Sequence, residues 1–259
     1  MTPLFSLHDL THFFGGLRAV FRLDMTIDEG ELVGLIGPNG AGKTTVFNLI
    51  TGIYKPTSGR IEFQGRDITA KAPHAINRLG IARTFQNIRL FHDMSIIDNI
   101  KVAARSSARY GLAGSLFHPR SFWVTEHDLD ARCRDLLAVF GLDKKADDRG
   151  SSLAYGEKRR LEIARALATG PSLLLLDEPA AGMNQSEARD LIDAVIWIKE
   201  HFKLTIFIIE HNMHVIMNVS QRIVVLDFGE MIAQGTPEQV RADPKVIEAY
   251  LGKEGAHAA

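Results

Sequence analysis

The sequence has almost no cysteine and no long hydrophobic segment. Cys133 is the single cysteine in 259 residues, which excludes a disulfide within the chain and indicates a reducing compartment. The longest apolar runs, residues 173–176 and 205–209, are far shorter than the roughly 20 residues of a membrane-spanning helix. The first ten residues have no basic stretch followed by a long apolar one, so we expect no signal peptide. We therefore expect any association with a membrane to go through a partner.

The chain also lacks an excess of charge of either sign. It has 30 basic and 31 acidic residues and a formal net charge of -1, so no global charge attracts it to nucleic acid. Its hydrophobic content of 46% is enough for a real core, in one large domain or two small ones.

Strand and helix patterns alternate in the first and last parts of the chain. Such alternation predicts a mostly parallel sheet with helices on both faces, and the two leading strands with a turn between them predict an antiparallel β subdomain. The expected strands span residues 4–10, 17–27, 31–36, about 60–63, 172–177, 204–210 and 222–229, and the expected helices span residues 43–51, 73–80, 184–202 and 212–219.

The middle of the chain has helical patterns and no convincing strand. Thr125 and Asp128 resemble a capping box that opens a helix through Phe140. Residues 109–123 are irregular and partly apolar, which fits either a surface loop or a packed insertion. We therefore predict an α/β core with an inserted α-helical subdomain. The predicted limits are residues 4–254 for a single domain, 4–90 and 170–254 for its core, 91–169 for the insertion and 255–259 for a flexible tail.

Residues 37–45, GPNGAGKTT, match the phosphate-binding loop pattern between a strand and a helix. Glycines let backbone N–H groups turn towards phosphates, and the helix start adds partial positive charge. Lys43 is expected to reach the β- and γ-phosphates, and the Thr44 hydroxyl to bind Mg²⁺. The alternative is a glycine-rich turn that matches by chance. The predicted nucleotide-binding residues of the loop are Gly37, Pro38, Asn39, Gly40, Ala41, Gly42, Lys43, Thr44 and Thr45.

Four further polar residues lie at or just beyond the ends of predicted strands, where ligands bind in parallel sheets, and one of these strands is a short one before Gln86. Asp177 is expected to hold Mg²⁺, and Glu178 to act as the general base on the attacking water. Gln86 is a candidate for sensing Mg²⁺ and that water, and His211 for a hydrogen bond to the γ-phosphate. Each also has a plainer interpretation: a charged surface turn for the carboxylates, a surface glutamine, or a histidine that caps a helix.

In this order along the chain, the phosphate loop, Gln86, LAYGE, LLLLDEP and His211 resemble the ATP-binding cassette (ABC) ATPases, which have a P-loop NTPase (RecA-like) core. The resemblance implies that two cassettes bind ATP head to tail, each placing its signature motif on the other's ATP. It also implies that an aromatic residue stacks on adenine. Phe14 is the candidate and Phe13 a weaker one, the alternative being a core phenylalanine. The implied signature residues are Leu153, Ala154, Tyr155, Gly156 and Glu157.

Five stretches further resemble the ATPases of bacterial branched-chain amino-acid importers: residues 83–91, 153–167, 173–184, 208–213 and 235–252. The irregular insertion around residues 104–125 also suits that group. This resemblance implies a peripheral position on the cytoplasmic side of the inner membrane. It also implies a second, different ATPase subunit, two permease subunits and a periplasmic binding protein. The implied substrates are typically leucine, isoleucine and valine, and sometimes other amino acids or amides. The rival hypotheses are lipopolysaccharide export, urea uptake, an ABC ATPase acting on nucleic acid, and a non-catalytic interaction module. The balanced charge and single cassette count against nucleic acid, and intact Lys43, Asp177 and Glu178 count against a non-catalytic module.

The signature region departs from the general ABC pattern. Ala154 stands where serine is usual, so a hydroxyl to the partner's ATP is missing and the activity of that site is left open. In the signature, Tyr155 replaces a glycine and Glu157 replaces a glutamine. Beyond it, Asn212 stands at a position where this branch of the family often has an acidic residue. The helix start also carries the cations of residues 158–160, against the helix dipole, which we interpret as positive charge left open for a triphosphate on another subunit.

Overall fold

A computed structural model describes residues 3–107 and 120–255. Its larger sheet has six strands in the order β10-β9-β3-β8-β7-β6, and all pairs are parallel except β10–β9. Every residue of β3, β7 and β8 is buried, as expected for strands covered on both faces, so the predicted mostly parallel sheet is confirmed. The strands are β3 (Leu32–Ile36), β6 (Ile81–Arg83), β7 (Leu173–Asp177), β8 (Thr205–Ile209), β9 (Arg222–Asp227) and β10 (Glu230–Gly235).

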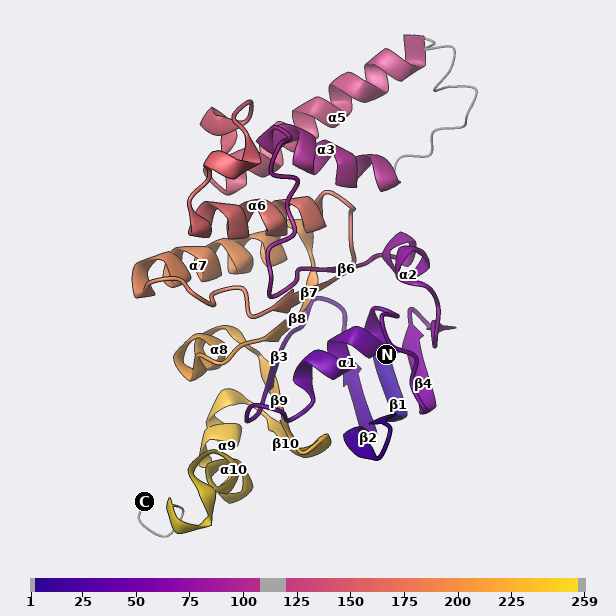
Figure 1. Cartoon of the computed structure of the whole chain (residues 1–259), viewed down its shortest axis with the longest axis vertical. Helices are drawn as coiled ribbons and strands as arrows, with labels where there is room; N and C mark the ends of the chain where they lie inside the picture. The colour runs from indigo at the N-terminus through magenta and orange to yellow at the C-terminus, as the bar shows by residue number, and fades with distance from the viewer. Residues whose placement is uncertain (1–2, 108–119, 256–259) are drawn as a thin grey trace.

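A second, antiparallel sheet lies on the other side of the first helix (Figure 1). Its order is β2-β1-β4-β5, which confirms the antiparallel β subdomain at the start of the chain. Buried side chains of both sheets and of that helix form one hydrophobic cluster, so the subdomain is packed firmly on the nucleotide-binding core. The strands are β1 (Phe5–Phe14), β2 (Leu17–Ile27), β4 (Ser58–Phe63) and β5 (Arg66–Asp67).

The four predicted helices of the core begin and end close to where the sequence predicts, and two further helices near the end of the chain, α9 (Pro237–Ala242) and α10 (Pro244–Gly255), were not predicted. Gly80, in the left-handed region at φ 108°, ends the helix that Pro73 opens. Asn184 caps its helix by accepting a hydrogen bond from the Glu187 N–H at 2.9 Å, as predicted. The last helix extends to Gly255, the first residue of the predicted tail, and residues 256–259 lie outside the described residues. The core helices are α1 (Lys43–Ile50), α2 (Pro73–Leu79), α7 (Gln185–Phe202), α8 (Met213–Val219), α9 (Pro237–Ala242) and α10 (Pro244–Gly255).

A helical region stands on one side of the larger sheet, with α6 next to α7 and with α3 and α5 beyond it (Figure 1). A second hydrophobic cluster runs continuously from these helices into the sheet, so the region shares a core with it. Its elements are α3 (Ile96–Ser107), α5 (Arg120–Val139), α6 (Tyr155–Leu167) and two short 3₁₀ turns (Asp143–Lys145 and Gly150–Ser152).

The predicted start of the long helix at Thr125 is wrong. Helix α5 already begins at Arg120, so Thr125 and Asp128 lie inside it. A Thr-x-x-Asp pattern does not by itself stop a helix, because keeping Thr and Asp in a helix interior costs only about 0.7 kcal/mol each or less. Residues 108–119, most of the irregular segment, lie outside the described residues. Among the residues that the structure describes, no helix is long and apolar enough to cross a membrane.

Candidate functional site

The loop between β3 and α1 has the shape of a phosphate cradle, and glycine is required at two of its positions. Gly37 has φ 151°, and a Cβ there would lie 2.0 Å from the backbone oxygen of Leu226. Gly42 has φ 100°, and its Cβ would lie 2.3 Å from the oxygen of Ala19. Such contacts exclude any side chain, so the glycines of the motif serve both the turn and close backbone packing.

Lys43 is buried at the start of α1, and its side chain turns back over the loop. Its Nζ donates hydrogen bonds to the oxygens of Gly37 at 2.7 Å and Pro38 at 2.8 Å. Burial lowers the pKa of Lys43, whereas the charges of Glu178 and Asp177 raise it. The ammonium group therefore lies in the field of two carboxylates, those of the predicted base Glu178 and of the predicted Mg²⁺ ligand Asp177. Of the other loop residues, those buried are Gly37 and Ala41, those half-buried are Pro38, Gly42 and Thr45, and those exposed are Asn39, Gly40 and Thr44.

Asp177, the last residue of β7, has one engaged and one unengaged carboxylate oxygen. Its Oδ2 accepts a hydrogen bond from Arg83 Nη2 at 2.7 Å, while the buried Oδ1 has no hydrogen-bond partner. Burial raises the pKa of Asp177, and the Arg83 guanidinium opposes that rise. A buried carboxylate oxygen without a partner, beside a phosphate loop, fits a ligand of a divalent cation.

No cluster of three or more His, Cys, Asp or Glu residues that could hold a metal occurs within residues 3–107 and 120–255. In nucleotide sites Mg²⁺ is commonly held by one or two protein ligands, completed by phosphate oxygens and water. Asp177 and the Thr44 hydroxyl could supply such a partial set.

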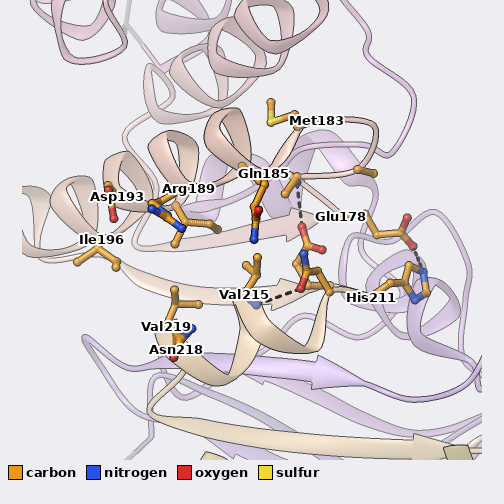
Figure 2. A pocket seen from close by; sticks show the side chains of 16 residues that line it. Glu178, Met183, Gln185, Arg189, Asp193, Ile196, His211, Val215, Asn218 and Val219 are labelled. Carbon is orange, nitrogen blue, oxygen red and sulfur yellow. Dashed lines mark hydrogen bonds and ion pairs between the residues drawn. The ribbon is translucent and has the colours of Figure 1, made fainter.

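Glu178 follows Asp177, and its carboxylate contacts the side chains of two other predicted site residues, Gln86 and His211. Its Oε2 accepts a hydrogen bond from Gln86 Nε2 at 3.0 Å, and its Oε1 lies 2.5 Å from His211 Nε2, as the dashed line in Figure 2 marks. The backbone of Glu178 is in the left-handed region at φ 49°, which is strained for a side chain of this kind. The residues that follow β6 and β8 thus converge on the carboxylate of the predicted base at the end of β7. The roles predicted for Gln86 towards Mg²⁺ and for His211 towards the γ-phosphate stay predictions.

A cavity of about 670 Å³ extends from Glu178 and His211 between α7 and α8 (Figure 2). Apolar side chains such as Ile192 and Val215 and polar ones such as Arg189 line it together. It places open space directly beside the predicted base.

Arg159 is a structural residue that the sequence interpretation missed. It lies in the first turn of α6, yet its side chain is fully buried. The guanidinium donates to the oxygens of Phe85 at 2.6 Å and Gln86 at 2.7 Å, and it pairs with Glu162 at 3.0 Å. The expectation that these cations are left open for a triphosphate is therefore wrong for Arg159, because its charge satisfies backbone carbonyls inside the protein. The i,i+3 spacing of the opposite charges of Arg159 and Glu162 was the available signal.

The start of α6 is capped by a residue within the motif itself. Ala154 has no side-chain acceptor, but its N–H donates to Glu157 Oε2 at 3.0 Å, so Glu157 supplies one half of a capping box. Lys145 Nζ binds Glu157 Oε1 at 2.6 Å, and this ion pair lowers the pKa of Glu157. Glu157 also offsets the cations of the first turn. The helix start is therefore better capped than its sequence indicates.

The remaining signature residues divide into a buried and an exposed set. Leu153 and Gly156 are buried, while Ala154 is exposed and Tyr155 keeps 46% of its surface exposed. The Tyr155 ring lies against Gly182, in the segment before α7. The exposed pair is available to another molecule, and the partner-ATP role of the motif stays a prediction.

Phe14 is not a core residue, which excludes the alternative that this phenylalanine only fills the hydrophobic core. It is 43% exposed at the end of β1, and its ring meets Tyr54 and His12 edge to face, with centroids 5.2 Å and 4.6 Å apart. Phe13 is exposed as well and meets Phe21. Adenine stacking on Phe14 stays a prediction.

Comparison with known proteins agrees with this site. The ABC transporter family matches residues 20–181, and the branched-chain amino acid ATP-binding cassette transporter family matches residues 230–256. Over 251 residues the chain is 44% identical to the high-affinity branched-chain amino acid transport ATP-binding protein LivG of Salmonella typhimurium, covering 97% of this chain and 98% of that protein. It is 42% identical to the corresponding protein BraF of Pseudomonas aeruginosa, with the same coverage.

Solved structures give the same result. The ADP conformation of MJ1267, an ATP-binding cassette of an ABC transporter, is 30% identical and superposes with a TM-score of 0.84, covering 98% of this chain and 100% of that one. A nucleotide-free cassette of an ABC transporter is 29% identical, with a TM-score of 0.82 over 97% of this chain and 100% of that one. The chain therefore belongs to the ABC transporter family and is one of its ATP-hydrolysing cassettes.

Proposed function

We propose that this cassette drives the uptake of branched-chain amino acids through membrane permease partners. The observation that carries the proposal is the convergence of Gln86 and His211 on Glu178 beside the phosphate loop, which equips the chain for hydrolysis. The match of residues 230–256 and the names of the relatives support the substrate class.

In this proposal, ATP binds along the phosphate loop, with adenine on Phe14 and the β- and γ-phosphates at Lys43. Thr44, Asp177 and Gln86 would hold Mg²⁺. The unpartnered Oδ1 of Asp177 supports this assignment. When bound, the ion neutralises charge that develops on the phosphates during hydrolysis.

Glu178 acts as the general base. Its carboxylate accepts a proton from a water molecule as the water oxygen attacks the γ-phosphorus, and ADP leaves with the electron pair of the broken bond. Gln86 and His211 each engage one oxygen of Glu178, and a carboxylate oxygen has a second lone pair for the water. His211 can also turn to the γ-phosphate, because its side chain is half-exposed, at 45%.

The second half of each ATP site comes from another ATPase subunit, placed head to tail and different from this chain in the cell. Leu153, Ala154, Tyr155, Gly156 and Glu157 face the partner's ATP. Ala154 offers no hydroxyl, so the helix contributes backbone N–H groups from Gly156 onward. Two permease subunits hold the pair at the cytoplasmic side of the bacterial inner membrane, and a periplasmic binding protein delivers the amino acid. Nucleic acid has no role.

Purification of the chain from its own membranes in mild detergent tests the proposal. We expect two multi-span membrane proteins and a second ATPase to co-purify, and ribosomes or DNA in their place would contradict a transport function. Uptake of radiolabelled leucine should fall to background in cells with Glu178→Gln. Loss of urea uptake or of lipopolysaccharide export instead would identify one of the rival transporters.

A further inference from the structure

Arg83, the last residue of β6, is almost completely buried beside the predicted Mg²⁺ site, with 5% of its side chain exposed. Its Nη2 donates to Asp177 Oδ2 at 2.7 Å. Its Nη1 donates to Asn48 Oδ1 at 2.7 Å and to Thr51 Oγ1 at 3.2 Å. The planar guanidinium of Arg83 thus joins Asp177, at the end of β7, to Asn48 in α1 and to Thr51 just after it.

The contacts on α1 lie on the face that also carries Thr44. Residues four apart on a helix are neighbours, so Thr44, Asn48 and Thr51 form one line along α1. The Thr51 hydroxyl donates to the Phe47 oxygen at 2.7 Å, which leaves its lone pairs for Arg83. The aromatic rings of Phe47 and Phe85 lie 5.5 Å and 5.0 Å from the guanidinium carbon. Arg83 is therefore held in place from several sides.

The hydrogen bond from Arg83 makes the two carboxylate oxygens of Asp177 different from each other. Oδ2 is occupied by Arg83, so the carboxylate cannot rotate freely, and Oδ1 is the oxygen left without a partner. A guanidinium fork suits this task, because it is planar and remains charged, whereas a lysine ammonium is a single point.

We propose that Arg83 is a positioning residue that sets the separation between Asp177 and Thr44, two of the predicted protein ligands of Mg²⁺, and so determines the affinity for the ion. This inference rests on the proposed Mg²⁺ site. Arg83 binds the carboxylate on one side and the Thr44-bearing face of α1 on the other. Groups that orient metal ligands from behind commonly change metal affinity by about 10- to 100-fold when mutated.

Metal binding by the full chain tests the inference, with Mn²⁺ as the probe. The free Mn²⁺ concentration is measured by electron paramagnetic resonance in the presence of a non-hydrolysable ATP analogue. Arg83→Lys keeps the charge and removes the fork, so we expect the Kd for Mn²⁺ to rise about tenfold. Affinity for the analogue without metal should change less than twofold. Arg89→Lys is the matched control, because Arg89 lies over the Phe85 ring at 4.3 Å and is exposed, and it should leave the Kd for Mn²⁺ unchanged.

Further variants separate the possible failures. Asn48→Ala, which loosens Arg83 from α1 without touching Asp177, should raise the Kd about threefold and decides the question if Arg83→Lys does not fold. In a protein that already carries Asp177→Asn, Arg83→Lys should raise the Kd for Mn²⁺ little further, because Arg83 acts through the Asp177 carboxylate. If Asp177→Asn weakens Mn²⁺ binding while Arg83→Lys and Asn48→Ala do not, the inference is overturned and the metal site stands. If Asp177→Asn and Thr44→Ala also have no effect, the Mg²⁺ site is overturned together with the inference.

Discussion

The two parts of the catalytic machinery are organised in different ways. At the strand ends of the larger sheet, Lys43, Asp177 and Glu178 are buried, and their side chains already contact one another or groups beside them. At the start of α6, by contrast, Ala154 and Tyr155 project from the protein, and the nearest polar group, Glu157, caps its own helix. The polar groups of the first region already contact one another within one chain, whereas Ala154 and Tyr155 in the second are exposed and are only predicted to meet the ATP of a partner.

The difference shows which interactions hold each region. The strand-end site is held by buried charge pairs, which are costly to break because a charge is left without its partner. The start of α6 is held by a helix cap, typically worth about 1 kcal/mol, and by a largely exposed ion pair, typically worth less than about 1 kcal/mol. The buried Arg159 connects the two regions, since it lies in α6 and binds the backbone beside Gln86.

The largest effect is expected from breaking that connection with Arg159→Met. The change leaves Glu162 and two backbone oxygens without their partner in the protein interior, so the free energy of unfolding should fall by about 3–5 kcal/mol. Urea unfolding measures it. Arg160→Met, the half-buried neighbour, should cost less than about 1 kcal/mol. If Arg159→Met and Arg160→Met lower the free energy of unfolding equally, the buried contacts of Arg159 with Phe85, Gln86 and Glu162 do not hold the start of α6 to the strand-end site.

A large loss of activity is expected at the strand-end site from Glu178→Gln. Without a general base, ATP turnover in the assembled complex should fall at least about 100-fold. Phosphate release measures turnover, and Glu200→Gln, an exposed position on α7, should retain it. Turnover near wild type in Glu178→Gln would show that another group takes the proton.

A smaller effect is expected at the start of α6 from Ala154→Ser. The added hydroxyl can bind the partner's ATP, so turnover in the assembled complex should rise about two- to fivefold, equivalent to one hydrogen bond. Ala168→Ser, at the other end of the helix, should leave turnover unchanged. If both variants match wild type, the missing hydroxyl does not limit the rate.

The smallest effect concerns the pH dependence of stability at the same helix start. Lys145 lowers the pKa of Glu157 in the folded protein, so the pair stabilises the fold above the pKa of the unfolded chain, near 4.5, and this stabilisation is lost as the pH falls through the folded pKa. Between pH 6 and pH 3.5, wild type should therefore lose slightly more stability than Lys145→Met, by less than about 1 kcal/mol. Urea unfolding at both values measures it, and Lys144→Met should behave as wild type. A variant that loses more than wild type would contradict the assigned pair.

Sequence patterns predicted the fold and the strand-end site well, for a physical reason. The strands are short apolar runs, and the carboxyl ends of parallel strands meet at one edge of the sheet, so Gln86, Glu178 and His211 had to come close. The start of α5 was mispredicted because a capping pattern also occurs inside helices. The phosphate loop was predictable because glycine is required at Gly37 and Gly42, where a Cβ would meet the backbone oxygens of Leu226 and Ala19.

The sequence by itself determined the class of the protein, the position of the phosphate loop and the order in which polar residues follow the strands of the larger sheet. These features depend on local conformation and on the order of elements along the chain. Only the tertiary structure decided that Arg159 points inward, that Glu157 caps its own helix and that Arg83 joins Asp177 to α1. A long polar side chain can reach many partners, and the partner that it takes is set by which distant backbone and carboxylate oxygens folding buries beside it.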